Sequence, residues 1–175
     1  TSSGLRGLLA YAEIHGVNSD VSSKINAGIN GILRKQKNNG AFGYWDKYSS
    51  IREKYQPYAI ETLQMALPFA DNKDAVVEGI TNGLEALYRM DLWEPSVRLY
   101  SYGILANSGY EVTTRIRYET DRLLNKIPDS WKSQKKLGIK QQELDNFAVA
   151  YWAATQINDD ERLSQINAIF LKQSS

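Results

Sequence analysis

The chain of 175 residues contains no cysteine and a single histidine, His15. The absence of cysteine excludes disulfide bonds, a thiolate nucleophile, iron–sulfur clusters and cysteine-ligated zinc within these residues. One histidine excludes any site that needs two imidazole groups. The net charge is only +1, which argues against a dedicated nucleic-acid-binding domain. No apolar run approaches the ~20 residues that a membrane span requires.

What the chain does contain is typical of a globular domain. Hydrophobic residues make up 42% and charged residues 23%, which argues against disorder. The length fits a single domain over residues 1–175. Because the sequence starts at Thr1 without an initiator methionine or a targeting segment, we expect this domain to be a piece of a much larger multidomain protein.

Apolar residues recur every three to four positions along most of the chain, which predicts an all-α fold. We expect a first helix that carries Leu5 to Ala12 and a second that is capped by Ser19 or Asp20 and ends at Gln36. Six further helices are predicted at about 55–68, 74–90, 95–108, 111–126, 141–156 and 159–171. Their predicted end signals are Pro95 at a helix start, Gly109 at a helix end and Asn158 as a cap. Tyr110 to Thr114 is the best candidate for a strand, and it is short.

Four of the predicted helices share an aromatic residue followed by a small one. The pairs are Tyr11-Ala12, Tyr58-Ala59, Tyr102-Gly103 and Phe147-Ala148, at spacings of 47, 44 and 45 residues. This period is typical of a repeated two-helix hairpin, in which the small residue lets a neighbouring backbone approach and the ring fills the gap between layers. We therefore predict four helical hairpins, with an irregular helical bundle as the alternative.

The segment from Gln36 to Trp45 combines a helix end, a turn and two spaced aromatic rings. Asn and Gly tolerate positive φ, so Asn38-Asn39-Gly40 favours a turn. Gln36 can then hydrogen-bond backbone groups that the turn leaves unpaired, and both rings can fold back on the helix end. We interpret this segment as a structural clasp, which closes one hairpin onto the next, rather than as an aromatic platform for a ligand. The residues of the clasp are Gln36, Gly40, Phe42, Gly43 and Trp45.

The pattern Gln36-x3-Gly40-x-Phe42-Gly43-x-Trp45-Asp46 resembles the QW-type repeats of the terpenoid-cyclase and prenyltransferase α/α toroids. It is more similar to the hallmark of the thioester-containing helical domain of bacterial α2-macroglobulin-like proteins. The segment Leu99–Ala106, followed by Gly109, resembles a later helix of the same domain. The resemblance covers most of the chain, and it implies helical hairpins that form an α/α toroid-like domain.

Bacterial α2-macroglobulin-like proteins are large envelope proteins that entrap a protease after it cleaves a bait region. The resemblance therefore implies a non-catalytic domain, not an enzyme, in the periplasm or at the cell envelope. Its partners would be other domains of the parent protein and, through the parent, target proteases. The tyrosines Tyr44, Tyr48, Tyr55 and Tyr58 suit such an interface between domains.

In many members of this family a Cys-x-Glu-Gln thioester motif lies just ahead of the first helix of the domain. Thr1 to Leu5 resembles the residues that follow that motif. Because the chain has no cysteine, no thioester-forming pair can be assigned to any of its positions. The motif either precedes Thr1 in the parent protein or is lost.

Two other functions fit an all-α chain. A fragment of a toroid-type cyclase would need an Asp-x-Asp-Asp segment, which the sequence lacks. The adjacent acids Asp159 and Asp160 are interpreted instead as first-turn residues of a helix, where the helix dipole favours negative charge. An α-solenoid protein-interaction module with an open concave face is the other alternative. His15, near the end of the first helix, is interpreted as a residue placed favourably against the dipole. No catalytic, cofactor-binding or metal-binding residue is predicted.

The clasp interpretation makes a prediction for Trp45. If the ring packs on the helix end, Trp45→Ala lowers the free energy of unfolding by roughly 3–5 kcal/mol, because a large buried side chain is removed. Thermal unfolding measures the change. An unchanged midpoint would argue against a packed ring at this position.

Overall fold

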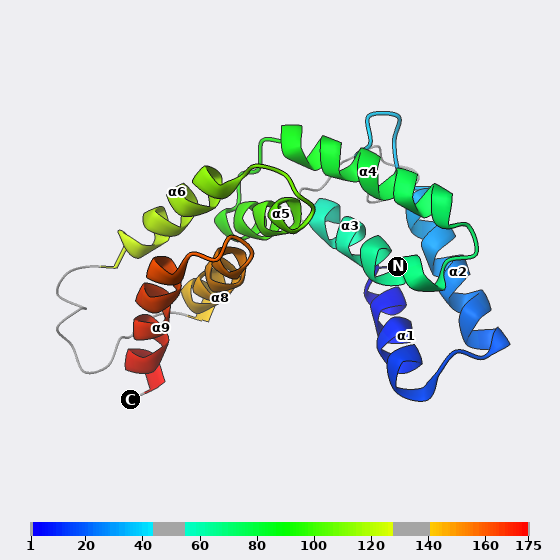
Figure 1. The fold of residues 1–175 in the computed structure, drawn as a ribbon, viewed down its shortest axis with the longest axis horizontal. Coiled ribbons are helices and arrows are strands. Elements are labelled where there is room, and N and C mark those ends of the chain that lie inside the picture. Colours follow the sequence, from blue (N-terminus) through cyan, green and yellow to red (C-terminus); the bar gives the residue numbers. More distant parts are fainter. Residues whose placement is uncertain (1, 44–54, 128–140, 175) are drawn as a thin grey trace. The chain divides into compact units, whose positions relative to one another are not determined.

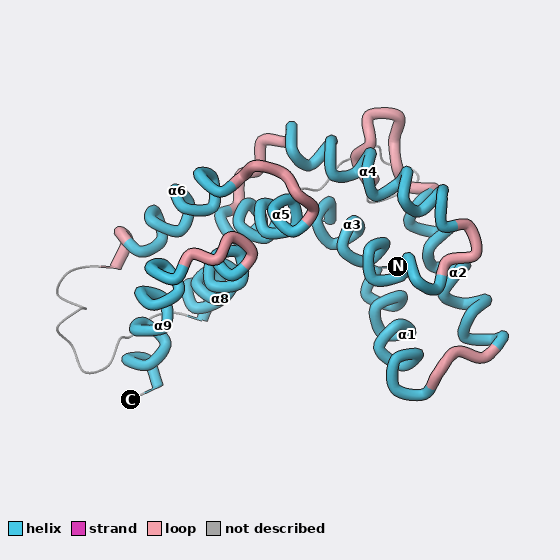
Figure 2. The backbone as a smooth tube through the Cα atoms, viewed as in Figure 1, coloured by secondary structure: helices cyan, strands magenta, loops and turns pink. Residues whose placement is uncertain are grey.

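The computed structural model describes residues 2–43, 55–127 and 141–174. Within these ranges the regular structure is helical and no strand is present, as Figure 2 shows, so the predicted all-α fold is confirmed. A 3-10 turn, Leu67–Phe69, follows the third helix. No helix in the described ranges is long and apolar enough to cross a membrane. The eight α-helices are α1 (Ser2–His15), α2 (Ser19–Leu33), α3 (Tyr55–Ala66), α4 (Lys73–Arg89), α5 (Pro95–Asn107), α6 (Thr113–Leu124), α8 (Gln141–Thr155) and α9 (Asp160–Ser174).

The predicted signals for the two ends of α5 are confirmed. Pro95 occupies the first turn, where a missing N–H costs nothing. After the helix, Gly109 has φ +84°, and its N–H donates to the carbonyl of Ala106 over 3.0 Å. The N–H of Tyr110 donates to the carbonyl of Leu105 over 2.9 Å. This pair of bonds is a Schellman motif, which satisfies carbonyls that the helix end leaves unpaired.

Two predicted caps are wrong by one or two residues. Asn18, rather than Ser19 or Asp20, caps α2, because its side-chain oxygen accepts from the N–H of Val21 over 2.9 Å. At the start of α9, Asn158 instead adopts a positive φ of 51°. Asp159 takes the capping role, since its Oδ1 accepts from the N–H of Arg162 over 3.3 Å.

The candidate strand at Tyr110 to Thr114 is also wrong. Thr113 is the first residue of α6, and the residues before it form the connection from α5. The apolar residue of that connection, Val112, is 2% exposed, so its burial rather than strand pairing explains the apolar pattern.

The chain divides into two compact units, residues 1–91 and residues 92–175. In each unit consecutive helices contact each other as hairpins: α1 with α2 and α3 with α4 in the first, α5 with α6 and α8 with α9 in the second (Figure 1). The first helices of the two hairpins also contact each other, and so do the second helices. Each unit is therefore a pair of stacked hairpins with the same set of contacts. A single domain over 1–175 and a toroid-like closure stay predictions.

Each unit has its own apolar core, made by the stripes that the helical periodicity predicts and, in the second unit, also by Leu92 ahead of α5. In the first unit the fully buried large side chains are Leu5, Leu9, Ile25, Ile60, Leu63 and Leu87. In the second unit they are Leu92, Leu99, Leu105, Ile116 and Ile166. Burial of such a side chain stabilises the fold by about 1.5–3 kcal/mol, so stacking the hairpins is what makes each unit stable.

The predicted role of the repeated aromatic residues is wrong for the first two repeats. Tyr11 and Tyr58 are 49% and 47% exposed, so neither ring fills a gap between layers. Their small neighbours Ala12 and Ala59 are buried as expected. In the fourth repeat Phe147 is buried as expected, but its small neighbour Ala148 is exposed. The small residue of the third repeat, Gly103, lies under the ring of Trp152 on α8.

The packing of Gly103 generates a prediction. A Cβ at this position would lie 2.2 Å from the Cζ3 atom of Trp152, far inside van der Waals contact. Gly103→Ala is therefore expected to lower the free energy of unfolding by about 1–3 kcal/mol through overpacking. Gly7→Ala in α1 is the matched control, because no atom lies within 4 Å of its added Cβ. The control should be neutral or stabilising by up to about 1 kcal/mol.

Thermal unfolding of both variants checks this pair. Equal midpoints would contradict the close approach of Gly103 to Trp152.

Candidate functional site

The clasp begins as a tight hairpin directly after α2. Gln36 and Phe42 form an isolated antiparallel bridge. Between them, the N–H of Lys37 donates to the carbonyl of Ala41 over 2.9 Å, and that of Gly40 donates to the carbonyl of Lys37 over 2.8 Å. Gly40 has φ +84°, a backbone conformation that strongly favours glycine. The predicted turn is thus present, with Gly40 at its left-handed position.

Two glutamine side chains attach this turn to the second helical hairpin. The Nε2 of Gln36 donates to the carbonyl of Gly40 over 2.9 Å and to the carbonyl of Gly79 on α4 over 2.8 Å. Gln56, on α3, pairs with the backbone of Phe42 at both ends: its Oε1 accepts from the N–H over 2.7 Å and its Nε2 donates to the carbonyl over 2.6 Å. These bonds satisfy backbone groups that burial would otherwise leave unpaired.

The turn also approaches the backbone of α4 very closely, at a face that carries two glycines. A Cβ on Gly40 would lie 2.2 Å from the carbonyl oxygen of Asn82. A Cβ on Gly83 would lie 2.9 Å from the Phe42 ring, and one on Gly79 would lie 2.4 Å from Leu33. The turn and the end of α2 therefore fit against α4 only because side chains are missing on both sides of the contact.

The structure brings together four of the five predicted clasp residues. Gln36, Gly40 and Phe42 make the contacts described above, and Phe42 is 2% exposed. The N–H of Gly43 donates to the carbonyl of Lys35 over 2.8 Å, which closes the base of the turn. Trp45 lies outside the described residues, so its predicted packing stays a prediction.

Only part of the predicted tyrosine cluster lies in the described residues. Tyr44 and Tyr48 are outside them, and Tyr55 at the start of α3 is half-buried. The ring of Tyr58 is 47% exposed and lies 4.9 Å below the guanidinium of Arg6 on α1. The same guanidinium forms an ion pair with Glu61, so a mixed aromatic and charged surface covers this side of α1 and α3.

The sequence interpretation missed Gln56, Gly79 and Gly83. A signal for the glycines was present, since two glycines four residues apart lie on one face of a helix and each costs about 1 kcal/mol relative to alanine. Such a pair indicates that another part of the chain packs closely against this face, at the expense of the helix's own stability. No comparable signal exists for Gln56, because its partner in the fold is 14 residues away in the chain.

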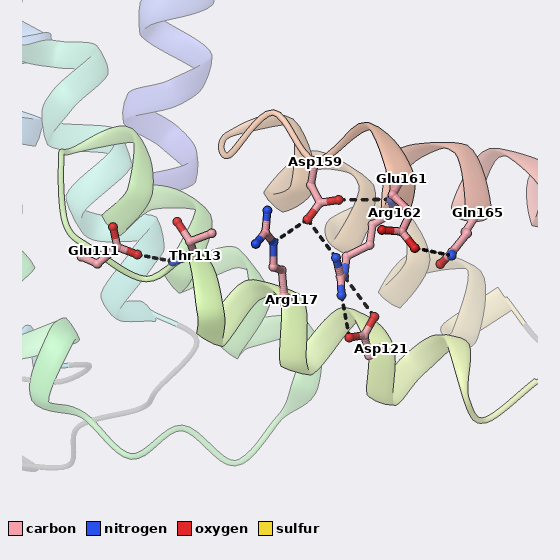
Figure 3. Close-up of polar contacts among 8 residues, drawn as sticks. All are labelled: Glu111, Thr113, Arg117, Asp121, Asp159, Glu161, Arg162 and Gln165. Carbon is pink, nitrogen blue, oxygen red and sulfur yellow. Dashed lines mark hydrogen bonds and ion pairs between the residues drawn. The ribbon is translucent and has the colours of Figure 1, made fainter.

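In the second unit, ion pairs join α6 and α9, the second helices of its two hairpins (Figure 3). The guanidinium of Arg162 on α9 forms a two-point ion pair with Asp121 on α6, over 3.0 and 2.7 Å. Asp159 accepts from Arg117 over 2.8 Å and from Arg162 over 3.0 Å. The predicted first-turn acid Asp159 is thus a buried cap, 5% exposed and held by two arginines. Asp160, by contrast, is exposed in the first turn of α9.

The contacts in this network shift the pKa values of Asp159 and Arg162. Burial by itself raises the pKa of Asp159, but the hydrogen bond from Arg117 and the hydrogen bonds and charge of Arg162 outweigh it. The pKa of this carboxyl therefore lies below its ordinary value. The hydrogen bonds to Asp121 hold the pKa of Arg162 above its ordinary value. Asp159 and Arg162 are consequently ionised at neutral pH, where their bonds to Arg117 and Asp121 link α9 to α6.

No group of three or more acidic or histidine side chains among the described residues is placed to hold a metal ion. Compared with known proteins, the chain matches no family model, no curated protein and no solved structure. The candidate site is the clasp, a set of hydrogen bonds and close backbone contacts.

The clasp predicts a specific cost for a side chain at Gly40. Gly40→Ala meets both a positive φ and the carbonyl of Asn82, whereas Gly16→Ala in the same unit meets a positive φ of 78° in open space. The control is expected to lower the free energy of unfolding by about 1–2 kcal/mol, the cost of a left-handed residue. Gly40→Ala should cost about 1–3 kcal/mol more, because the turn must move away from α4.

Urea unfolding of the two variants measures the difference between these free energies. If Gly40→Ala cost no more than Gly16→Ala, the contact with α4 would contribute nothing to stability.

The charge network predicts a pH-dependent contribution from Asp159. Its pKa is lower in the folded than in the unfolded chain, so the ionised carboxylate stabilises the fold above about pH 4. That contribution is lost as the pH falls through the lowered folded-state pKa. Asp159→Asn keeps a capping oxygen and removes the charge, so it should cost about 1–3 kcal/mol at pH 7 and progressively less below pH 4.

Asp160→Asn is the control, since Asp160 is exposed and the ion pairs described between α6 and α9 are made by other residues. Unfolding by urea at pH 7, 5 and 3 gives the three free-energy differences. A gap between wild type and Asp159→Asn that stays constant down to pH 3 would rule out the charge as its source.

Proposed function

We propose that the chain is a non-catalytic helical domain of a bacterial α2-macroglobulin-like protein, whose parent entraps proteases at the cell envelope. The observation that carries the proposal is the clasp. The segment that resembles the family's hallmark, Gln36 to Gly43, makes internal contacts between two helical hairpins. A family hallmark of this kind specifies a scaffold.

The groups of the clasp leave little chemistry for a ligand. The amide nitrogen of Gln36 donates two hydrogen bonds to backbone carbonyls, and both ends of the Gln56 amide bind the backbone of Phe42. The Phe42 ring is buried against Gly83 instead of lining an open surface. These contacts favour the structural clasp over the aromatic ligand platform, and they support a domain with a scaffolding role.

The proposal includes partners and a location. Other domains of the parent would contact this domain, and Tyr58 with its neighbouring Arg6 has the composition that suits such a contact, an exposed ring with a charged rim. Target proteases would be reached through the parent, in the periplasm or at the cell envelope. The finer arrangement proposed is an α/α toroid-like domain, in which further stacking of hairpins continues the pattern seen inside each unit.

One observation favours a second candidate, an α-solenoid interaction module. Both units stack their two hairpins through the same set of helix contacts, first helix on first helix and second helix on second helix. Repeats that contact only their neighbours are the basis of solenoids. A solenoid module would bind a partner directly through a concave face and would not require a bait region in a larger protein.

The sequence of the gene ahead of Thr1 tests the family. We expect a far longer multidomain chain, with Cys-x-Glu-Gln or a degenerate form of it directly upstream. A short stand-alone open reading frame would overturn the proposal and favour the solenoid module.

Entrapment by the full-length parent is tested with an active protease and two substrates. We expect cleavage of a small chromogenic peptide to persist while cleavage of a large protein substrate is lost, because a trapped protease is accessible only to small molecules. A protease with a blocked active site is the control, since it cannot cleave a bait region and should not be retained. Equal inhibition of both substrates, or of neither, would contradict the proposal.

A further inference from the structure

We draw no further inference here: the strongest candidate, the apolar groove of about 400 Å³ between the end of α6 and the second half of α9, lined by Leu124, Ile127, Ala168 and Ile169, carries nothing because none of the described residues shows what covers it.

Discussion

The first unit depends on how closely the turn after α2 approaches the backbone of α4. Gly40 on the turn and Gly79 and Gly83 on the helix remove the side chains that would keep the two backbones apart. Close approach buries backbone N–H and carbonyl groups, and each such group needs a partner. The amides of Gln36 and Gln56 provide these partners, since a primary amide offers both a donor and an acceptor. Glycine spacing and glutamine placement are therefore two parts of one requirement.

In the second unit the second helices of the two hairpins, α6 and α9, are joined by ion pairs instead. Arg162 bridges Asp121 and Asp159, and Arg117 adds a second cation to the buried carboxylate. Burying a carboxylate is costly unless opposite charges and hydrogen bonds offset the lost hydration. The amides of the clasp carry no charge, whereas the contact in the second unit includes the carboxylate of Asp159, whose pKa lies below its ordinary value. The two units thus share one stacking pattern and differ in the groups that join their helices.

Local sequence signals predicted the helices well because they act within a few residues. The periodicity of Leu5 and Leu9 or of Ile25 and Ile29 marks the buried face of a helix, and the structure buries all four side chains. Pro95 and Gly109 mark helix ends through their own backbone preferences. The capping residue of α2 was harder to predict, because Asn18, Ser19 and Asp20 are all favoured at this position and their order in the sequence does not decide between them.

Contacts between helices were harder to predict from the sequence. The exposure of Tyr11 and Tyr58 depends on which neighbour covers each face, and periodicity gives only the direction of the face. Gln56 pairs with Phe42 in the turn after α2, 14 residues away, and Asp159 with Arg117 on α6, 42 residues away. Neither residue type indicates a distant buried partner, since glutamine and aspartate side chains are mostly exposed to solvent. The clasp was predictable in part because its turn is local, while its docking face on α4 is not.

The way the clasp is built also bears on what the hallmark segment can do under the proposed function. A residue can bind or react with another molecule only through groups that are left available to it. In the clasp, the described bonds of both glutamine amides end on the chain's own backbone, and the Phe42 ring is enclosed. Such a segment fixes the relative placement of two hairpins without offering a reactive group. Under the proposed function, any reactive group of the parent would therefore have to come from residues other than these.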